Sequence, residues 1–475
     1  MKDQKVIPIN LINDSFSIES NKMEEECGVF AVYNAKQIDG IAYMMYSGLF
    51  ALQHRGQESA GITFNNFGDL HTVKGMGLVS EVFDLDELKV KYGNAAIGHV
   101  RYSTTGSSKL ANAQPLAAKS ILGDIALAHN GNLVNADRLR NHLEIDGTLF
   151  QSTTDSEVIL NLITKRARLG IKEAITESCQ IIRGGFALVI LIDNKLVAVR
   201  DPMGIRPLCM GKLPDSDTYV FASESCALDV VGAELIRDVQ PGEMIVIDEL
   251  GLNSSYYVEE TGQRASCSFE YIYFARPDTV LDGKDVYHVR GAAGRYLARQ
   301  TPVDADVVIG VPDSGIVAAI GYAEESGIPY SMGLVRNKYM GRSFILPNQE
   351  MRELAVKLKL NPMRQVIEGK RVILVDDSLV RGTTAKKLIK LVRSAGATEV
   401  HFRLASPMVK SECFFGVDIS SKEELIASKM SLDEIGQQIG ADSLDFLNIE
   451  NQREILGQDK FCEGCFTGSY PMLQQ

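Results

Sequence analysis

The chain has 475 residues, with 49 Lys and Arg against 61 Asp and Glu, and a formal net charge of −12. Its hydrophobic content of 45% and charged content of 23% are ordinary for globular proteins and exclude wholesale disorder. At about 150 residues per domain, the length allows two or three domains. The acidic balance disfavours nucleic acid or an anionic membrane as the main partner.

The first 26 residues end in three glutamates and contain no continuous apolar core, so they make a poor secretory signal. No apolar run approaches the roughly 18 residues needed to cross a bilayer. Eight cysteines are too few for a disulfide scaffold and fit a reducing compartment. We therefore expect a cytoplasmic protein that does not enter a membrane.

Residues 27–258 consist of short β-rich runs separated by Gly and Asn turns. Two longer segments, Ile38–Gln53 and Ser156–Arg168, are expected to be helices. The simplest arrangement is an α+β domain with two packed sheets. The expected strands are Gly28–Tyr33, Ala95–Val100, Ile121–Ala128, Phe186–Ile192, Lys195–Arg200 and Met244–Ile247.

After about residue 285, strands alternate with helices. This pattern predicts a parallel α/β sheet with ligands at the carboxyl ends of its strands. The expected strands are Val307–Val311, Arg371–Val375 and Val400–Ala405, and the expected helices are Ile316–Ser326, Thr384–Ser394 and Ser431–Gly440.

Cys27 begins the segment Cys-Gly-Val-Phe directly after Glu26. A cut between these two residues would give Cys27 a free α-amine with a pKa of about 7.7–8.0, able to take the thiol proton near neutral pH. The alternative is a buried apolar cysteine at the start of a strand, which is the commoner state of an unpaired cysteine.

Further motifs supply what hydrolysis of an amino-acid amide needs. Arg101 can clamp an α-carboxylate in a bidentate pair, and Asp155 can pair with an α-ammonium group. The Asn130 side chain and the Gly131 N–H can donate to a tetrahedral oxyanion. Taken singly, each motif also fits an ordinary salt bridge, hairpin turn or helix cap.

In order and spacing, these motifs resemble the class II glutamine amidotransferases, which have an N-terminal nucleophile. The resemblance implies an αββα sandwich, a propeptide of residues 1–26, Cys27 as nucleophile, Asn130 and Gly131 as catalytic donors, and Arg55, Arg101 and Asp155 as substrate-binding residues. The matched segments are Cys27-Gly28, Gln53-His54-Arg55-Gly56, His99-Val100-Arg101-Tyr102, His129-Asn130-Gly131-Asn132 and Thr154-Asp155-Ser156-Glu157.

A second constellation lies in the later half. Asp376 and Asp377 end a predicted strand, where two carboxylates are costly unless a cation or a hydroxyl donor meets them. The following loop, Ser378–Thr384, has small residues and Gly382, so its N–H groups and hydroxyls can cradle a phosphate at a helix N-terminus. It is neither a Walker A loop nor a dinucleotide fingerprint. The alternative is a capped helix with solvated aspartates.

This constellation resembles the phosphoribosyl-diphosphate motif of type I phosphoribosyltransferases. The resemblance implies that Asp376 and Asp377 bind ribose hydroxyls or Mg²⁺. Residues of the loop cradle the 5′-phosphate, a diphosphate loop follows an earlier strand with Ser314 near the metal, and a mobile basic loop spans Arg336–Arg342. The implied binding residues are Asp313, Ser314, Gly315, Ser378, Arg381, Gly382, Thr383 and Thr384.

Both halves together, with Phe274-Ala275-Arg276-Pro277-Asp278 between them, narrow the resemblance to the glutamine phosphoribosylpyrophosphate amidotransferase family. Asparagine synthetase and hexosephosphate aminotransferase share only the first half. The family implies transfer of ammonia from glutamine to phosphoribosyl diphosphate, giving 5-phosphoribosylamine in the first step of purine synthesis. It also implies inhibition by purine nucleotides and a homotetramer. The expected divisions are a propeptide (1–26), a glutaminase domain (27–258), a junction (259–284), a phosphoribosyltransferase domain (285–412) and a tail (413–475).

Four cysteines remain to be explained: the pair Cys462-x-x-Cys465, and the isolated Cys267 and Cys413. By count, four thiolates suit zinc or an iron–sulfur cluster equally well. The resemblance extends to the Bacillus-like branch of the family and implies a [4Fe-4S] cluster on these residues. The remaining cysteines, Cys179, Cys209 and Cys226, are expected in the core.

A different class of function is a regulator that senses phosphoribosyl diphosphate without catalysis. Such proteins usually lose catalytic residues or gain a basic DNA-binding module. The presence of Cys27, Arg101 and Asp155 and the net charge of −12 favour the enzyme.

Overall fold

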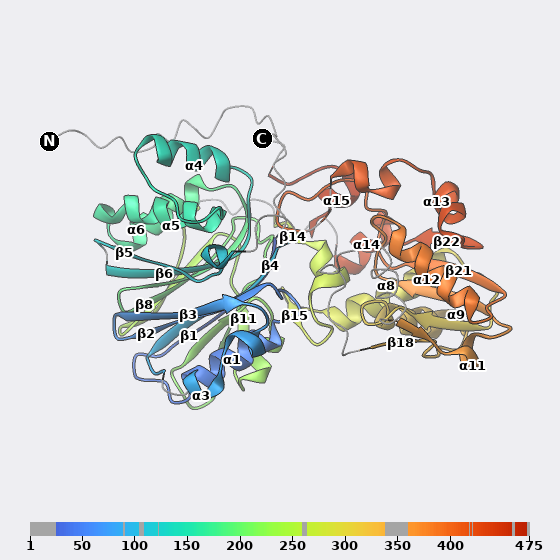
Figure 1. The fold of residues 1–475 in the computed structure, drawn as a ribbon, viewed down its shortest axis with the longest axis horizontal. Helices are drawn as coiled ribbons and strands as arrows, with labels where there is room; N and C mark the ends of the chain where they lie inside the picture. The colour runs from blue at the N-terminus through green and yellow to red at the C-terminus, as the bar shows by residue number, and fades with distance from the viewer. Residues whose placement is uncertain are drawn as a thin grey trace.

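The computed structural model describes residues 25–88, 91–103, 109–121, 123–258, 264–337, 360–417, 419, 421–457 and 461–472. These residues form two halves that lie side by side, the earlier one drawn in blue to green and the later one in yellow to red (Figure 1). The expected order of an α+β sandwich followed by an α/β domain is confirmed.

The first half contains two antiparallel sheets, with strand orders β11-β9-β10-β1-β4-β2-β3 and β13-β12-β8-β7-β6-β5. Their facing apolar side chains form one core, to which β1 contributes Val29 and Ala31 and β7 contributes Val189 and Leu191. The strands are β1 (Glu25–Tyr33), β2 (Ser59–Asn66), β3 (Asp69–Met76), β4 (Ala95–Ser103), β5 (Leu116–Ser120), β6 (Gly123–Leu133), β7 (Gly184–Ile192), β8 (Lys195–Arg200), β9 (Cys209–Lys212), β10 (Tyr219–Ala222), β11 (Glu234–Asp238), β12 (Glu243–Asp248) and β13 (Gly251–Tyr256).

Helices cover both outer faces of the sandwich, with α4, α5 and α6 above and α1 and α3 below in Figure 1. Every residue of β7 is buried because one of its faces meets the other sheet and the other meets these helices. The helices are α1 (Ile41–Ala51), α2 (Val79–Val82), α3 (Leu85–Leu88), α4 (Ala136–Ile145), α5 (Asp155–Lys165), α6 (Ile171–Ile181) and α7 (Cys226–Val230), with 3₁₀ turns η2 (Leu110–Asn112) and η3 (Ala167–Leu169).

Short elements connect the halves. The π-helical turn η4 (Glu270–Phe274) lies here, followed by the hairpin of β15 (Val280–Leu281) and β16 (Lys284–Asp285). Just before η4, β14 (Ser266–Cys267) pairs in parallel with β23 (Phe461–Cys462) from the end of the chain. The tail therefore returns to the junction.

The second half is built on a parallel sheet of order β17-β20-β21-β22. Helices α8 and α9 pack on one face, and α12 and α13 on the other. The edge strand β22 comes from the tail, beyond the expected domain end at residue 412. The elements are α8 (Val286–Gln300), β17 (Val307–Gly310), α9 (Ile316–Ser326), β18 (Leu334–Arg336), β19 (Leu360–Pro362), α11 (Arg364–Ile367), β20 (Arg371–Asp376), α12 (Thr383–Ser394), β21 (Glu399–Leu404), η6 (Lys422–Glu424), η7 (Ile426–Ser428), α13 (Leu432–Ile439), β22 (Ser443–Phe446), α14 (Ile449–Leu456) and α15 (Gly464–Thr467).

Candidate active sites

Cys27 is the third residue of β1, near the middle of the seven-stranded sheet. It is fully buried and lies opposite Arg101 of β4, which in turn lies opposite Ser59 of β2. Because β1 begins at Glu25, the peptide bond between Glu26 and Cys27 lies within a strand of the uncut chain.

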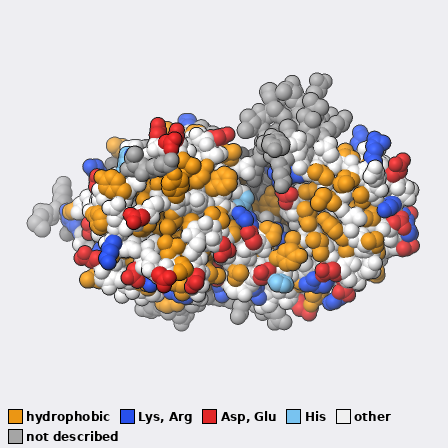
Figure 2. Space-filling model, turned by 90° about the horizontal axis from the view of Figure 1, so that it is seen from below, with side chains coloured by type: hydrophobic (Ala, Val, Ile, Leu, Met, Phe, Trp, Pro, Cys, Tyr) orange, Lys and Arg blue, Asp and Glu red, His pale blue; other side chains and the backbone are white. Residues whose placement is uncertain are grey.

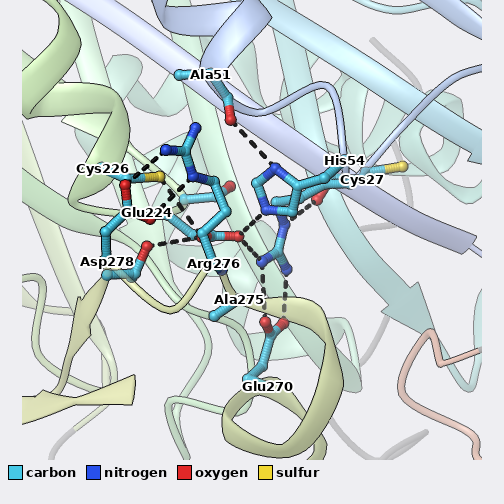
Figure 3. A network of polar contacts seen from close by, with 12 residues as sticks. Cys27, Ala51, His54, Glu224, Cys226, Glu270, Ala275, Arg276 and Asp278 are labelled. Atoms are coloured by element: carbon cyan, nitrogen blue, oxygen red, sulfur yellow. Dashed lines mark hydrogen bonds and ion pairs between the residues drawn. The ribbon is translucent and has the colours of Figure 1, made fainter. Parts of the chain in front are cut away.

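The guanidinium of Arg55 lies against the backbone of β1, the strand that contains Cys27. Its Nε donates to the Cys27 carbonyl oxygen at 2.9 Å, its Nη1 lies 2.6 Å from Glu224 Oε1, and its Nη2 lies 2.6 Å from Glu270 Oε1. Figure 3 shows this network, to which His54 also belongs, with the Cys27 side chain pointing away from the two glutamates. Burial disfavours the charged guanidinium, but the charges of Glu270 and Glu224 outweigh this and raise the pKa of Arg55. The nitrogens expected to bind substrate are thus engaged by protein groups.

Asn130 and Gly131 lie within β6, which continues five residues past the expected end of this strand, so the alternative of a hairpin turn is wrong. Gly131 has φ of 146°, and a Cβ there would lie 2.0 Å from the Gly185 carbonyl oxygen on β7. Only glycine fits this position. The Asn130 side chain is fully buried, and its Nδ2 donates to Ser223 Oγ at 3.4 Å.

Asp155 is the first residue of α5, and its carboxylate contacts the end of β6. Its Oδ2 accepts the Leu133 N–H at 3.0 Å, and its Oδ1 lies 3.5 Å from His129 Nδ1. Burial opposes ionisation, but the nearby His129 and the hydrogen bonds lower the pKa of Asp155. Asp155 therefore stays a carboxylate close to the strand that carries Asn130.

The structure brings these candidates to one end of the sandwich, where β1, β4, β6 and α5 meet. Cys27 and Arg101 are register partners, and Asn130 is joined to β1 through Ser223. His99 of β4 lies beside them, with Nε2 3.0 Å from the His129 carbonyl oxygen of β6. Arg101 is itself buried and donates to Glu58 at 3.2 Å.

The phosphoribosyl candidates gather at the carboxyl ends of the adjacent parallel strands β17 and β20. The hydroxyls of Ser314, after β17, and Ser378, after β20, both donate to the Asp377 carboxylate. Asp313 pairs with Arg336 at 2.8 Å. The remainder of the expected basic loop, residues 338–342, lies outside the described residues.

Asp376 and Asp377 are adjacent carboxyl groups whose surroundings disfavour ionisation. Burial, and then the charge of Asp377, raise the pKa of Asp376 well above its usual range. Burial also raises the pKa of Asp377, against hydrogen bonds from Ser314 and Ser378. Hard oxygen ligands in such a pair suit a divalent cation such as Mg²⁺.

The loop after β20 ends at Gly382, the N-cap of α12, with φ of 77°. A Cβ there would lie 2.6 Å from Ile426 Cδ1. Thr383 and Thr384 form the first turn of α12, where N–H groups lack acceptors within the helix and favour an anion. Arg381 at the loop pairs with Glu424 at 2.9 Å. After β17, Gly315 leaves no room for a side chain, since a Cβ would lie 2.5 Å from the Val375 carbonyl oxygen.

The four candidate cluster ligands meet at the junction. Cys267 and Cys462 are register partners in β14 and β23, Cys465 lies in α15, and Cys413 packs on the same apolar cluster. Burial, and then the neighbouring thiols, raise the pKa values of Cys462 and Cys465. No disulfide joins any of the eight cysteines, all of which are among the described residues. In that part of the chain, no three His, Cys, Asp or Glu side chains are grouped to hold a single metal ion.

Three residues of these sites have no sequence motif to mark them. Ser223, Glu224 and Glu270 contact Asn130 or Arg55 from positions 93, 169 and 215 residues away along the chain. Their positions became evident only once the strands were assembled.

Comparison with known proteins matches the two halves to separate family models. Residues 99–230 match a glutamine amidotransferase domain, and residues 281–412 match a phosphoribosyl transferase domain. A relative named amidophosphoribosyltransferase, from Methanocaldococcus jannaschii, is 47% identical over 94% of this chain and 97% of its own. The chain belongs to the amidophosphoribosyltransferase family.

Solved structures of this family agree. The glutamine phosphoribosylpyrophosphate amidotransferase of B. subtilis, complexed with ADP and GMP, has a TM-score of 0.88 and 46% identity, covering 94% of this chain and 98% of its own. A structure described as the allosteric regulatory enzyme of purine biosynthesis has a TM-score of 0.89 and 47% identity, covering 94% and 97%. The prediction of an amidophosphoribosyltransferase at the first step of purine biosynthesis is confirmed, and the non-catalytic regulator is excluded. No described helix is long and apolar enough to span a membrane.

Proposed function

We propose that Cys27, once residues 1–26 are removed, hydrolyses glutamine and that the released ammonia reacts at the Asp376–Asp377 site. The observation that carries this assignment is the meeting of Cys27, Arg101 and Asn130 at one end of the sandwich. The intact peptide bond before Cys27 leaves no α-amine, so cleavage supplies the base. The chemistry and the cysteines fit a reducing cytoplasm.

In the first reaction, the Cys27 α-amine takes the thiol proton and the sulfur attacks the carboxamide carbon of glutamine. The carbonyl electrons move to oxygen, where the Asn130 side chain and the Gly131 N–H donate to the oxyanion. The oxyanion then collapses and the C–N bond breaks, while the ammonium returns its proton to the departing nitrogen. Ammonia leaves a thioester, and water hydrolyses it to glutamate with return of the thiol.

Arg101 and Asp155 hold the amino-acid end of glutamine in this proposal. The buried guanidinium suits a carboxylate, and the ionised Asp155 suits the α-ammonium group. We assign Arg55 a different role from the substrate binding expected of it. Its Nε holds the Cys27 carbonyl, and its other nitrogens neutralise Glu224 and Glu270.

In the second reaction, ammonia attacks C1 of phosphoribosyl diphosphate and diphosphate departs. The loop Ser378–Thr384, including Arg381 and Gly382, cradles the 5′-phosphate at the start of α12, and the Asp313–Gly315 loop receives the diphosphate. Asp376, Asp377 and Ser314 would hold Mg²⁺, which when bound supplies positive charge to the leaving diphosphate. The raised pKa values of both aspartates fit a site completed by a cation.

The cysteine group would hold a [4Fe-4S] cluster through Cys267, Cys413, Cys462 and Cys465. A zinc site needs all four sulfurs on one ion, and no described group is so arranged, whereas each iron of a cubane cluster takes one thiolate. Because β14 comes from the junction and β23 from the tail, the cluster would join these segments.

Regulation and assembly follow from the same family. Because the B. subtilis structure contains ADP and GMP, we propose that purine nucleotides bind and inhibit this chain as well. For a homotetramer, the support is the apolar surface: hydrophobic side chains are spread over both halves on the face in Figure 2, and exposed examples in the chain include Tyr43, Phe50 and Tyr287.

The test of this function is Cys27→Ala. The variant should lose glutamine-dependent formation of phosphoribosylamine and keep the ammonia-dependent reaction, whereas the core variant Cys179→Ala should keep both. Mass spectrometry of active enzyme should give Cys27 as the first residue. Survival of glutamine-dependent activity in Cys27→Ala, or full activity with the first 26 residues attached, would contradict the assignment.

A further inference from the structure

Ser223 follows β10 and lies against the strand that carries the nucleophile. Its N–H donates to the Val29 carbonyl oxygen at 3.0 Å, and its Oγ accepts the Val29 N–H at 2.9 Å. Ser223 is fully buried, and these two bonds hold β1 only two residues beyond Cys27. Its side chain therefore has a fixed position relative to the nucleophile.

The same hydroxyl reaches across to the second sheet. Asn130 Nδ2 donates to Ser223 Oγ at 3.4 Å, and no hydrogen-bond partner of Asn130 Oδ1 lies among the described residues. Ser223 is thus the described group that fixes the rotation of the Asn130 amide. Because an amide NH₂ carries two hydrogens, one bond to Ser223 leaves the second N–H for another acceptor.

We propose that Ser223 is the positioning residue for the oxyanion donor Asn130. This inference rests on the proposed role of Asn130 in glutamine hydrolysis. Stabilisation requires a donor about 2.7–3.1 Å from the position that the oxyanion will occupy, so small rotations of the amide matter. Because Ser223 bonds both β1 and the Asn130 amide, it determines the position of the Asn130 N–H donor relative to the attacking sulfur.

A double-mutant cycle of Ser223→Ala and Asn130→Ala tests the pairing through glutamine hydrolysis. Removal of an oxyanion donor typically costs about 10²–10³-fold in kcat, and we expect this of Asn130→Ala. Ser223→Ala should lower kcat about tenfold with KM for glutamine little changed, since a misplaced donor still contributes part of that stabilisation. In the double variant, the loss should equal that of Asn130→Ala alone, because residues acting as one unit are not additive.

A second measurement separates positioning from general damage to β1. Alkylation of Cys27 by iodoacetamide forms a C–S bond and releases iodide without an oxyanion, so Ser223→Ala should leave its rate unchanged, as read by mass spectrometry of the Cys27 peptide. The matched control is Ser225→Ala, which also removes a buried hydroxyl that accepts a backbone N–H, from Val280 at 2.8 Å, but does not contact Asn130. Its kcat should match the wild type.

The Asn130 and Ser223 variants distinguish failure of the proposed role of Asn130 from failure of the role of Ser223. If Asn130→Ala hydrolyses glutamine at the normal rate, the proposed role of Asn130 fails. If Asn130→Ala is slow, three results would each overturn the positioning role of Ser223. These are a normal kcat in Ser223→Ala, a kcat in the double variant reduced by the product of the two single losses, and slower alkylation of Cys27 in Ser223→Ala. Slow hydrolysis with normal alkylation and no further loss in the double variant supports it.

Discussion

The Nε of Arg55 donates to the carbonyl oxygen of Cys27 at 2.9 Å, so this buried guanidinium holds the backbone at Cys27. The same side chain neutralises Glu224, which follows β10, and Glu270, which begins η4 at the junction. Through this one buried ionic group, β1 is joined to the segment that connects the two halves.

Replacing Arg55 with Met should destabilise the protein strongly. Breaking a buried pair by removing one partner leaves uncompensated charge, and we expect the free energy of unfolding in urea to fall by about 3–5 kcal/mol. The control is Arg299→Met, which removes an exposed pair with Glu325 and should lower the free energy of unfolding far less. Equal effects of the two substitutions would show that the Arg55 network does not stabilise the fold.

The stability of the protein should fall in acid through His99. Burial lowers the pKa of His99 to about 3, whereas an unfolded histidine titrates near 6.5, so the unfolded chain binds the extra proton between these values. The neutral His99 therefore contributes fully to the free energy of unfolding above pH ~6.5. As the pH falls below this value the contribution is lost, and at pH 5 the free energy of unfolding should be lower by about 2 kcal/mol.

Urea unfolding of wild type and His99→Gln at pH 7 and pH 5 measures this effect. Wild type should lose more stability than His99→Gln between the two values, and the variant of exposed His288, His288→Gln, should behave as wild type. An identical pH dependence in His99→Gln would mean that His99 takes up its proton between pH 7 and pH 5 in the folded protein as it does in the unfolded chain.

Asp376→Asn and Asp377→Asn should block phosphoribosylamine formation with both glutamine and ammonia. Because we propose that these carboxylates hold Mg²⁺ at the second site, we expect a loss of about 10²–10³-fold, similar to the cost of removing an oxyanion donor. Without a bound cation, Asp376→Asn should not lower the unfolding temperature. The substitution removes a carboxyl group whose ionisation is disfavoured by burial and by the charge of Asp377. Asp304→Asn, at an exposed acid outside the site, is the control. Near-normal turnover in both variants would move the site elsewhere.

Cys462→Ser should release iron from protein purified without oxygen. A [4Fe-4S] cluster predicts about four irons and four sulfides per chain in the wild type, and loss of one thiolate should lower both. The buried Cys179→Ser variant should retain them, because Cys179 packs in the core between β-sheet and helices. About one zinc per chain, with no iron, would instead assign the four cysteines to a zinc site.

Local signals predicted several elements well. The helix expected at Ile316–Ser326 has those bounds, with glycines at both ends. In α13, Ser431 Oγ accepts the Glu434 N–H and Gly440 ends the helix with φ of 82°, as a capping box and a terminal glycine lead one to expect. Such signals depend on neighbours within a few residues, so they can be recognised without the fold.

Local signals did not predict where β6 ends, because non-local contacts determine it. Asn-Gly is a strong hairpin signal, yet β6 runs through Asn130–Gly131 and pairs with β7 there. Gly131 lies opposite Phe186, and its lack of a Cβ leaves room for the neighbouring Gly185 carbonyl oxygen. The sequence also does not predict the tail strand β22. This strand forms because it pairs with β21, which comes earlier in the chain, and local patterns do not show such pairing.

The order of motifs was sufficient to determine the family and its two chemistries, because each loop, such as Asp376–Thr384, carries its functional groups within one short segment. Only the folded chain decided what holds those groups in place. Ser223 meets Asn130 across 93 residues and Glu270 meets Arg55 across 215, and contacts over such separations arise from the packing of sheets, which leaves no pattern in neighbouring residues.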